Sequence, residues 1–158
     1  MNALAKKLGK RLKRRRAMLV TAESCTGGWV AQAVTAISGS SEWFERGFVT
    51  YSNEAKQEML GVRKKTLRKY GAVSEETARE MASGALKKSD ATIAVSITGI
   101  AGPTGGSNSK PVGMVCFAFA TSRGVFSETH RFKGNRESVR RQSVIRALEG
   151  ILEVLRGG

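Results

Sequence analysis

A short polar segment, Thr21-Ala22-Glu23-Ser24-Cys25-Thr26-Gly27-Gly28, combines residue types that can do chemistry. It places a serine hydroxyl beside a cysteine thiol, and its two glycines let backbone approach a ligand closely. Residues 18–20 predict the end of a buried strand and residues 29–36 predict a helix. A helix N-terminus offers unpaired N–H groups, which favour an anion or a developing oxyanion. The segment is therefore a candidate catalytic turn, and the structural alternative is a helix capped by Ser24 or Thr26.

A serine nucleophile at such a turn needs a general base to remove its proton, and the sequence contains few candidate bases. The single histidine, His130, falls in a predicted hairpin strand, which disfavours a Ser-His-Asp triad. A lysine with a lowered pKa can activate a serine instead, and Lys56 is the nearest candidate; the alternative is an ordinary surface lysine. Tyr51, at the end of the preceding predicted strand, could project into the same cleft. Cys25 remains a rival nucleophile, and a set of Cys25, Glu23 and Lys56 stays open.

A second segment of interest, residues 98–113, holds five glycines and both prolines of the chain. It follows a predicted central strand, and ligands of α/β sheets bind beyond the carboxyl ends of strands, where Ser24 would also lie. The spacing before Lys110 is wrong for a Walker phosphate loop. Arg136 and Arg140, four residues apart, share one face of the last predicted helix and could hold a phosphate. A solvated helix face is the alternative for these two arginines.

Length and composition narrow the class of protein. The 158 residues fit one domain, and 41% hydrophobic residues are enough for one core. No apolar run approaches the roughly 20 residues that span a bilayer. The two cysteines, Cys25 and Cys116, are too few for a disulfide framework and indicate a reducing cytoplasm. One histidine without paired cysteines argues against a structural zinc site, and we expect neither a metal nor a cofactor.

The net charge of +14 is concentrated at the start of the chain. Residues 1–16 contain eight lysines and arginines and no acid, and Leu4, Leu8 and Leu12 recur every four positions. This pattern predicts an amphipathic helix with a basic outer face. Such a face suits nucleic acid or an anionic membrane. The absence of aromatic residues for base stacking favours a surface helix that only attracts phosphorylated substrates.

Strands and helices alternate along the chain. The composition predicts strands over residues 46–51, 91–97, 112–120 and 125–132, the last two forming an antiparallel hairpin. Helices are expected over residues 1–16, 53–60 and 64–70, from Ser74 to about Lys88, and after Asn135 to the C-terminal end. The alternation indicates an α/β domain, residues 1–158, with a mixed sheet.

Four strings in this order, TAESCTGG, GFVTYSNEAK, TGIAGPTGGSNSKPVG and GNRESVRR, resemble the CinA family. The likeness is greatest to its stand-alone C-terminal-domain members, the nicotinamide-nucleotide amidases, and it extends from about Leu4 to Leu155. The resemblance implies a three-layer α/β/α fold with a mixed, mostly parallel five-stranded sheet. It also implies hydrolysis of the carboxamide of nicotinamide mononucleotide to nicotinate mononucleotide and ammonia, in pyridine-nucleotide salvage.

The resemblance also implies roles for individual residues. By position, Ser24 resembles the family's nucleophile and Lys56 its base, while Tyr51 and Thr98 resemble polar residues that line the site. Tyr51 is also a candidate catalytic residue, which could relay the Lys56 proton to the departing ammonia. Further expected substrate contacts are the backbone of Thr26, Gly27 and Gly99 and the side chain of Arg136 or Arg140. The expected partner is a small nucleotide rather than a membrane, with nucleic acid bound at most weakly and non-specifically. A homo-oligomer and a nucleic-acid-binding function through the basic helix both remain open.

Overall fold

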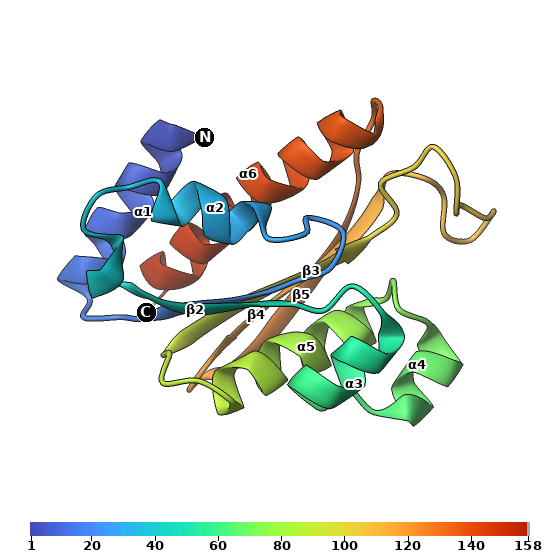
Figure 1. Ribbon diagram of the computed structural model, residues 1–158, viewed down its shortest axis with the longest axis horizontal. Helices are drawn as coiled ribbons and strands as arrows, with labels where there is room; N and C mark the ends of the chain where they lie inside the picture. The colour runs from blue at the N-terminus through green and yellow to red at the C-terminus, as the bar shows by residue number, and fades with distance from the viewer. Residues whose placement is uncertain (158) are drawn as a thin grey trace.

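A five-stranded sheet lies between two layers of helices in the computed structural model, which describes residues 1–157 (Figure 1). The strand order is β2-β1-β3-β4-β5. β1 pairs in parallel with β2 and β3, whereas β3–β4 and β4–β5 are antiparallel, so β4 alone runs against the other strands. The predicted mixed α/β fold is therefore confirmed. The strands are β1 (Leu19–Glu23), β2 (Phe44–Val49), β3 (Ile93–Gly99), β4 (Met114–Thr121) and β5 (Gly124–Arg131).

Helices lie on both faces of the sheet (Figure 1). One layer contains α1 (Asn2–Arg14), α2 (Trp29–Thr35) and α6 (Arg136–Arg156), and a 3-10 turn spans Ser40–Glu42. The other contains α3 (Asn53–Leu60), α4 (Lys64–Tyr70) and α5 (Glu75–Lys87). The side chains of Ser52, Ser74 and Asn135 cap α3, α5 and α6, each accepting a backbone N–H three residues on.

The second strand differs from its prediction. It spans Phe44–Val49 rather than residues 46–51, so Tyr51 lies beyond the strand in the turn that leads into α3. The reason is that its partner β1 ends at Glu23, whose carbonyl accepts one last bond from the N–H of Thr50 at 2.9 Å. β3 likewise starts at Ile93, two residues later than expected, and continues to Gly99.

The sheet buries apolar side chains on both faces. All five residues of β1 are buried, as expected for a central strand covered by helices on both sides. Leu8 and Leu12 of α1 are fully buried in the core, where α1 contacts α6, and Leu4 packs at the edge of that core. The predicted amphipathic helix is therefore present, and its apolar stripe belongs to the core.

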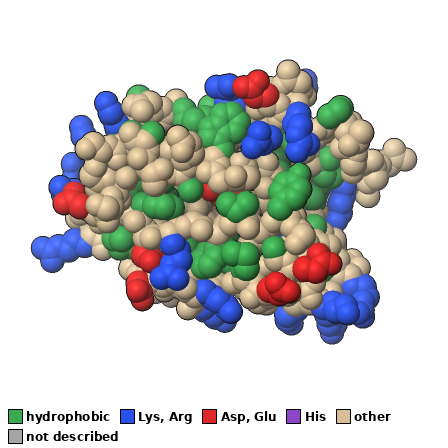
Figure 2. Space-filling model, viewed as in Figure 1, with side chains coloured by type: hydrophobic (Ala, Val, Ile, Leu, Met, Phe, Trp, Pro, Cys, Tyr) green, Lys and Arg blue, Asp and Glu red, His purple; other side chains and the backbone are tan. Residues whose placement is uncertain are grey.

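Lysines and arginines gather on the surface where α1 and α4 lie (Figure 2). On α1 the cations point away from the core, and Lys13 forms an ion pair of 2.9 Å with Glu42. Within residues 1–157, no helix combines the length and the apolar character needed to cross a membrane.

Candidate active site

Ser24 and Lys56 meet at the carboxyl end of β1. Ser24 follows β1 directly, and its N–H donates to the carbonyl of Ile97 at 2.9 Å, which fixes the turn against β3. Lys56 lies on α3, and its Nζ is 3.0 Å from the Ser24 Oγ. Both side chains are buried, with Lys56 only 1% exposed. The structure thus brings together the predicted nucleophile and base and removes Lys56 from the surface.

Two backbone carbonyls hold the Lys56 amine. Its Nζ donates to the carbonyl oxygens of Thr50 at 2.9 Å and Tyr51 at 3.2 Å. No carboxylate takes part in these three contacts, so burial lowers the pKa of Lys56 by disfavouring the ammonium form. A neutral amine has two N–H groups and one lone pair. With its N–H groups on the carbonyls, the lone pair is left to face the Ser24 hydroxyl.

A buried carboxylate, Glu23, organises the turn that carries Ser24. It is fully buried and accepts from the Thr26 hydroxyl at 2.7 Å and from the N–H groups of Gly28, Val30 and Ala31 at 2.9–3.2 Å. It therefore takes the place of a side-chain cap for α2, which begins after Gly28 in a left-handed conformation with φ of 101°. Neither Ser24 nor Thr26 caps this helix, and the capping alternative is wrong.

Arg140 fixes the other side of the same turn. Its Nε donates to the carbonyl of Cys25 at 3.0 Å, a second guanidinium nitrogen donates to the carbonyl of Thr26 at 3.2 Å, and the group lies over the Trp29 ring. The Cys25 carbonyl and the Thr26 N–H belong to one trans peptide unit and point in opposite directions. The hydrogen bond from Arg140 to the Cys25 carbonyl therefore also sets the direction of the Thr26 N–H. The N–H of Gly27 is engaged with the Ser24 carbonyl at 3.0 Å.

A cavity of about 320 Å³ opens in front of the Ser24–Lys56 pair. Arg136 lines it and donates to the Gly102 carbonyl at 2.8 Å and to the Tyr51 phenol oxygen at 3.4 Å. Thr98 also lines it, with its hydroxyl donating to the Ala72 carbonyl at 2.8 Å. The remaining wall comes from the end of β3 and the loop after it, residues 99–102, 104 and 105, and from residues 72–73 before α5. The Tyr51 phenol thus reaches Arg136 rather than Lys56.

Cys25 also lines the cavity, but its environment differs from that of Ser24. Burial raises the pKa of the Cys25 thiol to about 12. The reactive form of cysteine is the thiolate, so the thiol is a poor nucleophile near neutral pH. Of the two rivals at this turn, Ser24 alone has a base within hydrogen-bonding distance in the described contacts.

The predicted site residues fall into two groups. Ser24, Lys56, Tyr51, Thr98, Gly99 and Arg136 line the cavity, whereas the Thr26 hydroxyl, Gly27 and the Arg140 guanidinium lie behind the turn. Sequence reasoning did not assign a role to the Glu23 carboxylate as a cap, or to the wall at residues 72–73. Glu23 is a carboxylate at the end of a buried strand, which marks the position as unusual, although no local pattern shows what the carboxylate binds. Among residues 1–157, no cluster of three or more His, Cys, Asp or Glu side chains is placed to hold a metal ion.

Comparison with known proteins identifies the family of this chain. The protein-family model of the CinA C-terminal domain matches residues 1–155 of this chain. The nicotinamide-nucleotide amidohydrolase PncC of Escherichia coli (strain K12) is 60% identical over 147 residues, which cover 92% of this chain and 89% of that protein. The protein of the same name from Pseudomonas putida is 50% identical over 154 residues, covering 98% and 96%.

Solved structures give the same result. The competence/damage inducible protein CihA from Agrobacterium tumefaciens is 47% identical, with a TM-score of 0.94 over 98% of this chain and 94% of that one. A competence-damaged protein (CinA) superfamily protein from Klebsiella pneumoniae is 38% identical, with a TM-score of 0.96 over 99% and 98%. On the family model, the sequence identities and these structures, the chain belongs to the CinA C-terminal domain family.

Proposed function

We propose that this hydrolase cleaves the carboxamide of nicotinamide mononucleotide, giving nicotinate mononucleotide and ammonia. The observation that carries the proposal is the buried Ser24–Lys56 pair, 3.0 Å apart, at the edge of a cavity. The similarity to proteins named nicotinamide-nucleotide amidohydrolase supports the choice of substrate. The reaction consumes one water, and it requires a nucleophile, a base and a donor for the developing oxyanion.

In the first half of the reaction, Lys56 takes the proton of the Ser24 hydroxyl as Oγ attacks the carboxamide carbon. The carbonyl oxygen becomes an oxyanion, for which the Thr26 N–H is the proposed donor, because Arg140 holds the carbonyl of the same peptide unit. The Lys56 ammonium then passes its proton to the nitrogen of the leaving group. The C–N bond breaks, ammonia departs, and a nicotinoyl ester remains on Ser24.

In the second half, neutral Lys56 takes a proton from water, which attacks the ester carbon. Collapse of the second tetrahedral intermediate returns the proton from Lys56 to the Ser24 oxygen and releases nicotinate mononucleotide. The carbonyls of Thr50 and Tyr51 keep the amine aimed at Ser24 through both halves. They also stabilise the ammonium each time it forms, since both accept hydrogen bonds from it.

Arg136 is the proposed partner of the 5′-phosphate. Its guanidinium lines the cavity and is bound only by neutral acceptors, the Gly102 carbonyl and the Tyr51 hydroxyl, among the described contacts. Arg140 is engaged with the turn behind Ser24, so we assign it to positioning of the nucleophile. Thr98 and Gly99 also line the cavity and would contact the pyridine ring.

Two further points complete the proposal. We place the reaction in the cytoplasm, because both cysteines are buried free thiols that a reducing compartment preserves. The cations of α1 would raise the local concentration of phosphorylated substrate through their field. Duplex DNA should bind only at the non-specific level, with a Kd of about 10⁻⁴–10⁻⁶ M that weakens steeply as salt rises.

The direct test is ammonia release by the purified protein. With nicotinamide mononucleotide we expect ammonia and nicotinate mononucleotide in equal amounts, with far slower release from free nicotinamide, which has no phosphate for Arg136. The Ser24→Ala variant supplies the background rate, and a chelator should leave the wild-type rate unchanged. A folded wild-type protein that releases no ammonia from the nucleotide would refute the proposal.

A further inference from the structure

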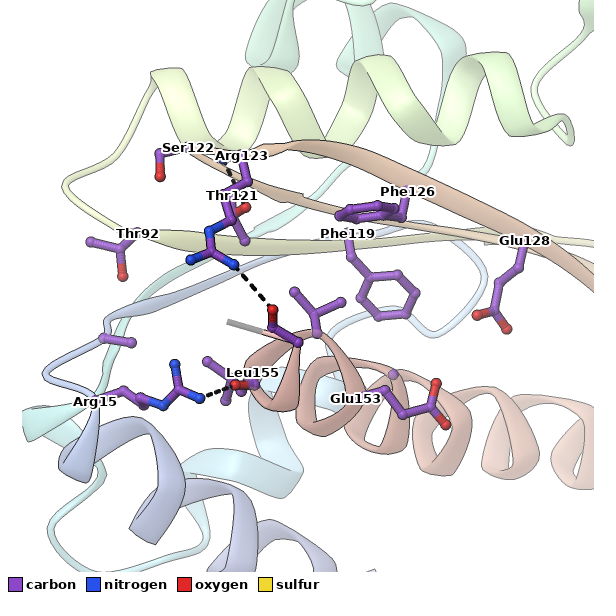
Figure 3. Close-up of a pocket in the computed structure, with 14 residues that line it drawn as sticks. Arg15, Thr92, Phe119, Thr121, Ser122, Arg123, Phe126, Glu128, Glu153 and Leu155 are labelled. Carbon is purple, nitrogen blue, oxygen red and sulfur yellow. Dashed lines mark hydrogen bonds between the residues drawn. The ribbon is translucent and has the colours of Figure 1, made fainter.

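Cationic side chains hold carbonyls at the ends of two helices in this fold. The last C=O groups of a helix have no partner within it, and lysine or arginine side chains can donate to them. In a separate cavity of about 580 Å³, Arg15 donates to the carbonyl of Leu155 near the end of α6 (Figure 3). Lys110 makes a similar contact at the end of α4, where its Nζ donates to the carbonyl of Tyr70, 40 positions earlier in the sequence. Unlike the first contact, this one adjoins the candidate active site.

Tyr70 is the first residue of a wall segment, residues 70–73, that leads from α4 to α5. In this wall segment, Ala72 and Val73 line the cavity of the candidate active site. Lys110 comes from the segment after β3, whose earlier part lines the same cavity. Lys110 itself is not one of the described lining residues, so its ammonium joins two walls of the cavity from outside.

The backbone of the wall segment leaves room for the Lys110 ammonium at Gly71. Gly71 has a φ of 82°, in the left-handed region that favours glycine, and a Cβ added there would lie 2.8 Å from the Lys110 Nζ. A side chain at this position would therefore push the ammonium away from the Tyr70 carbonyl. The close approach of Lys110 thus depends on a glycine in the wall segment.

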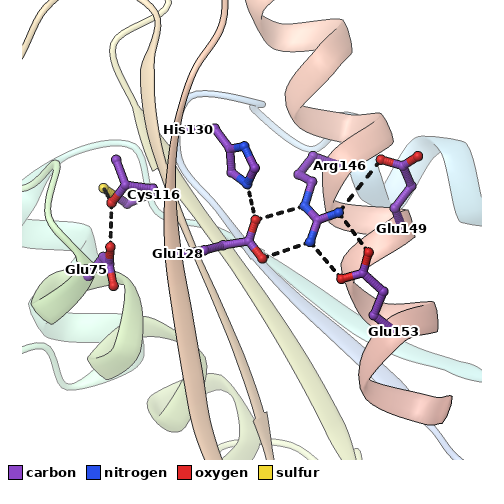
Figure 4. Close-up of polar contacts among 8 residues, drawn as sticks. Glu75, Cys116, Glu128, His130, Arg146, Glu149 and Glu153 are labelled. Atoms are coloured by element: carbon purple, nitrogen blue, oxygen red, sulfur yellow. Dashed lines mark hydrogen bonds and ion pairs between the residues drawn. The ribbon is translucent and has the colours of Figure 1, made fainter. Parts of the chain in front are cut away.

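The rest of the wall segment is held by other contacts. The Thr77 hydroxyl donates to the carbonyl of Gly71 at 2.7 Å. Glu75, in the first turn of α5, accepts from the hydroxyl of Thr129 on β5 at 2.6 Å (Figure 4). These contacts fix the side of the wall segment that continues into α5. At its first residue, the carbonyl has Lys110 as its side-chain donor among the described hydrogen bonds.

The backbone that carries Lys110 is itself anchored. The Lys110 N–H donates to the Ser107 hydroxyl at 3.1 Å, and the Ser107 N–H donates to the Lys110 carbonyl at 2.8 Å. The N–H of Gly113 then donates to the carbonyl of Ile100 at 2.7 Å, which closes the segment after β3 onto itself. Lys110 therefore starts from a fixed point, and its contact with Tyr70 can hold the wall segment in place.

We propose that Lys110 is a positioning residue for substrate binding, whose ammonium holds the wall segment against the segment after β3 and so sets the width of the cavity. The role rests on the proposed function, which supplies the substrate. Ser24 and Lys56 are fixed by hydrogen bonds to the backbone of residues 50, 51 and 97, which belong to neither wall. Loss of the Lys110 contact should therefore weaken substrate binding while the nucleophile and the base keep their geometry.

The kinetics of ammonia release test this role. Lys110→Met should raise KM for nicotinamide mononucleotide about tenfold with little change in kcat, since one hydrogen bond from a charged donor is lost. KM for the riboside, which lacks the phosphate, should rise by the same factor. Lys110→Arg keeps a cationic donor and should restore most of the lost affinity. Lys87→Met removes an exposed lysine of α5 that has no hydrogen bond or ion pair among the described contacts, and this matched control should behave as the wild type. A rise in KM for the nucleotide alone would mean that Lys110 only attracts the phosphate, and would overturn the proposal.

Hydrogen–deuterium exchange tests the same contact without any substrate. The amide hydrogens of residues 71–73 should exchange about tenfold faster in Lys110→Met than in the wild type and in Lys87→Met, because the wall segment opens more easily once the Tyr70 carbonyl is released. Lys110→Gln, which is shorter and uncharged, replaces Lys110→Met if circular dichroism shows that the methionine variant does not fold. Unchanged exchange in the wall segment would overturn the proposal. Faster exchange in the variant of a protein that releases no ammonia would refute the proposed function alone.

Discussion

The Lys56 amine lies 3.0 Å from the Ser24 hydroxyl oxygen, although the two residues are 32 positions apart in the sequence. Parallel pairing of β1 with β2 creates this contact, because it brings the turn after β1 next to the segment that leads into α3. The amine is buried and bound by carbonyls rather than by a carboxylate. These surroundings disfavour the ammonium form, which is the condition that a lysine base requires.

The rate of ammonia release should therefore rise with pH. The pKa of Lys56 is lowered by burial, so the neutral amine becomes available at a lower pH than for an ordinary lysine. We expect kcat/KM to increase as pH rises through this lowered pKa and then to level off. Lys56→Met should reduce kcat by about 10²–10⁴-fold and abolish this limb of the profile. A flat profile in the wild type would contradict the assignment of the base.

The same lowered pKa has a consequence for stability. The native state loses the Lys56 proton at a lower pH than the unfolded state, which retains it up to a pKa of about 10.4. Between these two values the unfolded state binds more protons, so the free energy of unfolding of the wild type increases with pH. Lys56→Met should be the more stable protein at neutral pH, with an advantage that shrinks toward pH 10. Urea melts of both proteins across this range measure the difference.

Glu23 should act as a positioning residue for Ser24. Glu23→Gln removes the charge and places an amide N–H₂ where N–H donors converge, which should cost about 1–3 kcal/mol of stability. Because the turn then relaxes, kcat should fall with little change in KM. Glu80→Gln is the matched control, since Glu80 accepts from the Arg63 N–H and the Thr66 hydroxyl away from the cavity. Equal loss of activity in both variants would reduce Glu23 to a purely structural role.

Replacement of Arg136 and replacement of Arg140 should change different kinetic constants. Arg136→Ala should raise KM for nicotinamide mononucleotide about 10–100-fold, as expected for the loss of charge-assisted hydrogen bonds to a phosphate. It should leave turnover of the riboside, which lacks the phosphate, unchanged. Arg140→Ala should instead lower kcat for both compounds, because Arg140 holds the carbonyls of Cys25 and Thr26. A higher KM in Arg140→Ala together with a lower kcat in Arg136→Ala would mean that Arg140 binds the phosphate and Arg136 positions the nucleophile.

Much of this site could be predicted from local sequence. The Ser24 turn follows a short apolar strand, and Lys56 lies on a helix that Ser52 caps, so both positions followed from nearby residues. The function of Glu23 could not be predicted, because its acceptor role depends on how the chain folds back over residues 26–31. The different roles of Arg136 and Arg140 depend on packing. The two residues are one helical turn apart on α6, yet Arg136 faces the cavity whereas Arg140 contacts the backbone of the segment after Ser24. The cavity wall at residues 72–73 comes from a distant loop that no local pattern marks.

The central claim is that Ser24, and not its neighbour Cys25, attacks the carboxamide. The measurement that tests it most directly is ammonia release from nicotinamide mononucleotide by wild type, Ser24→Ala and Cys25→Ala, with circular dichroism as a control for folding. We predict that Ser24→Ala loses at least about 10³-fold in kcat. Cys25→Ala should stay within about threefold of wild type, because its thiol, with a pKa of about 12, is not ionised at neutral pH. A nearly wild-type rate in Ser24→Ala together with an inactive Cys25→Ala would contradict the serine mechanism.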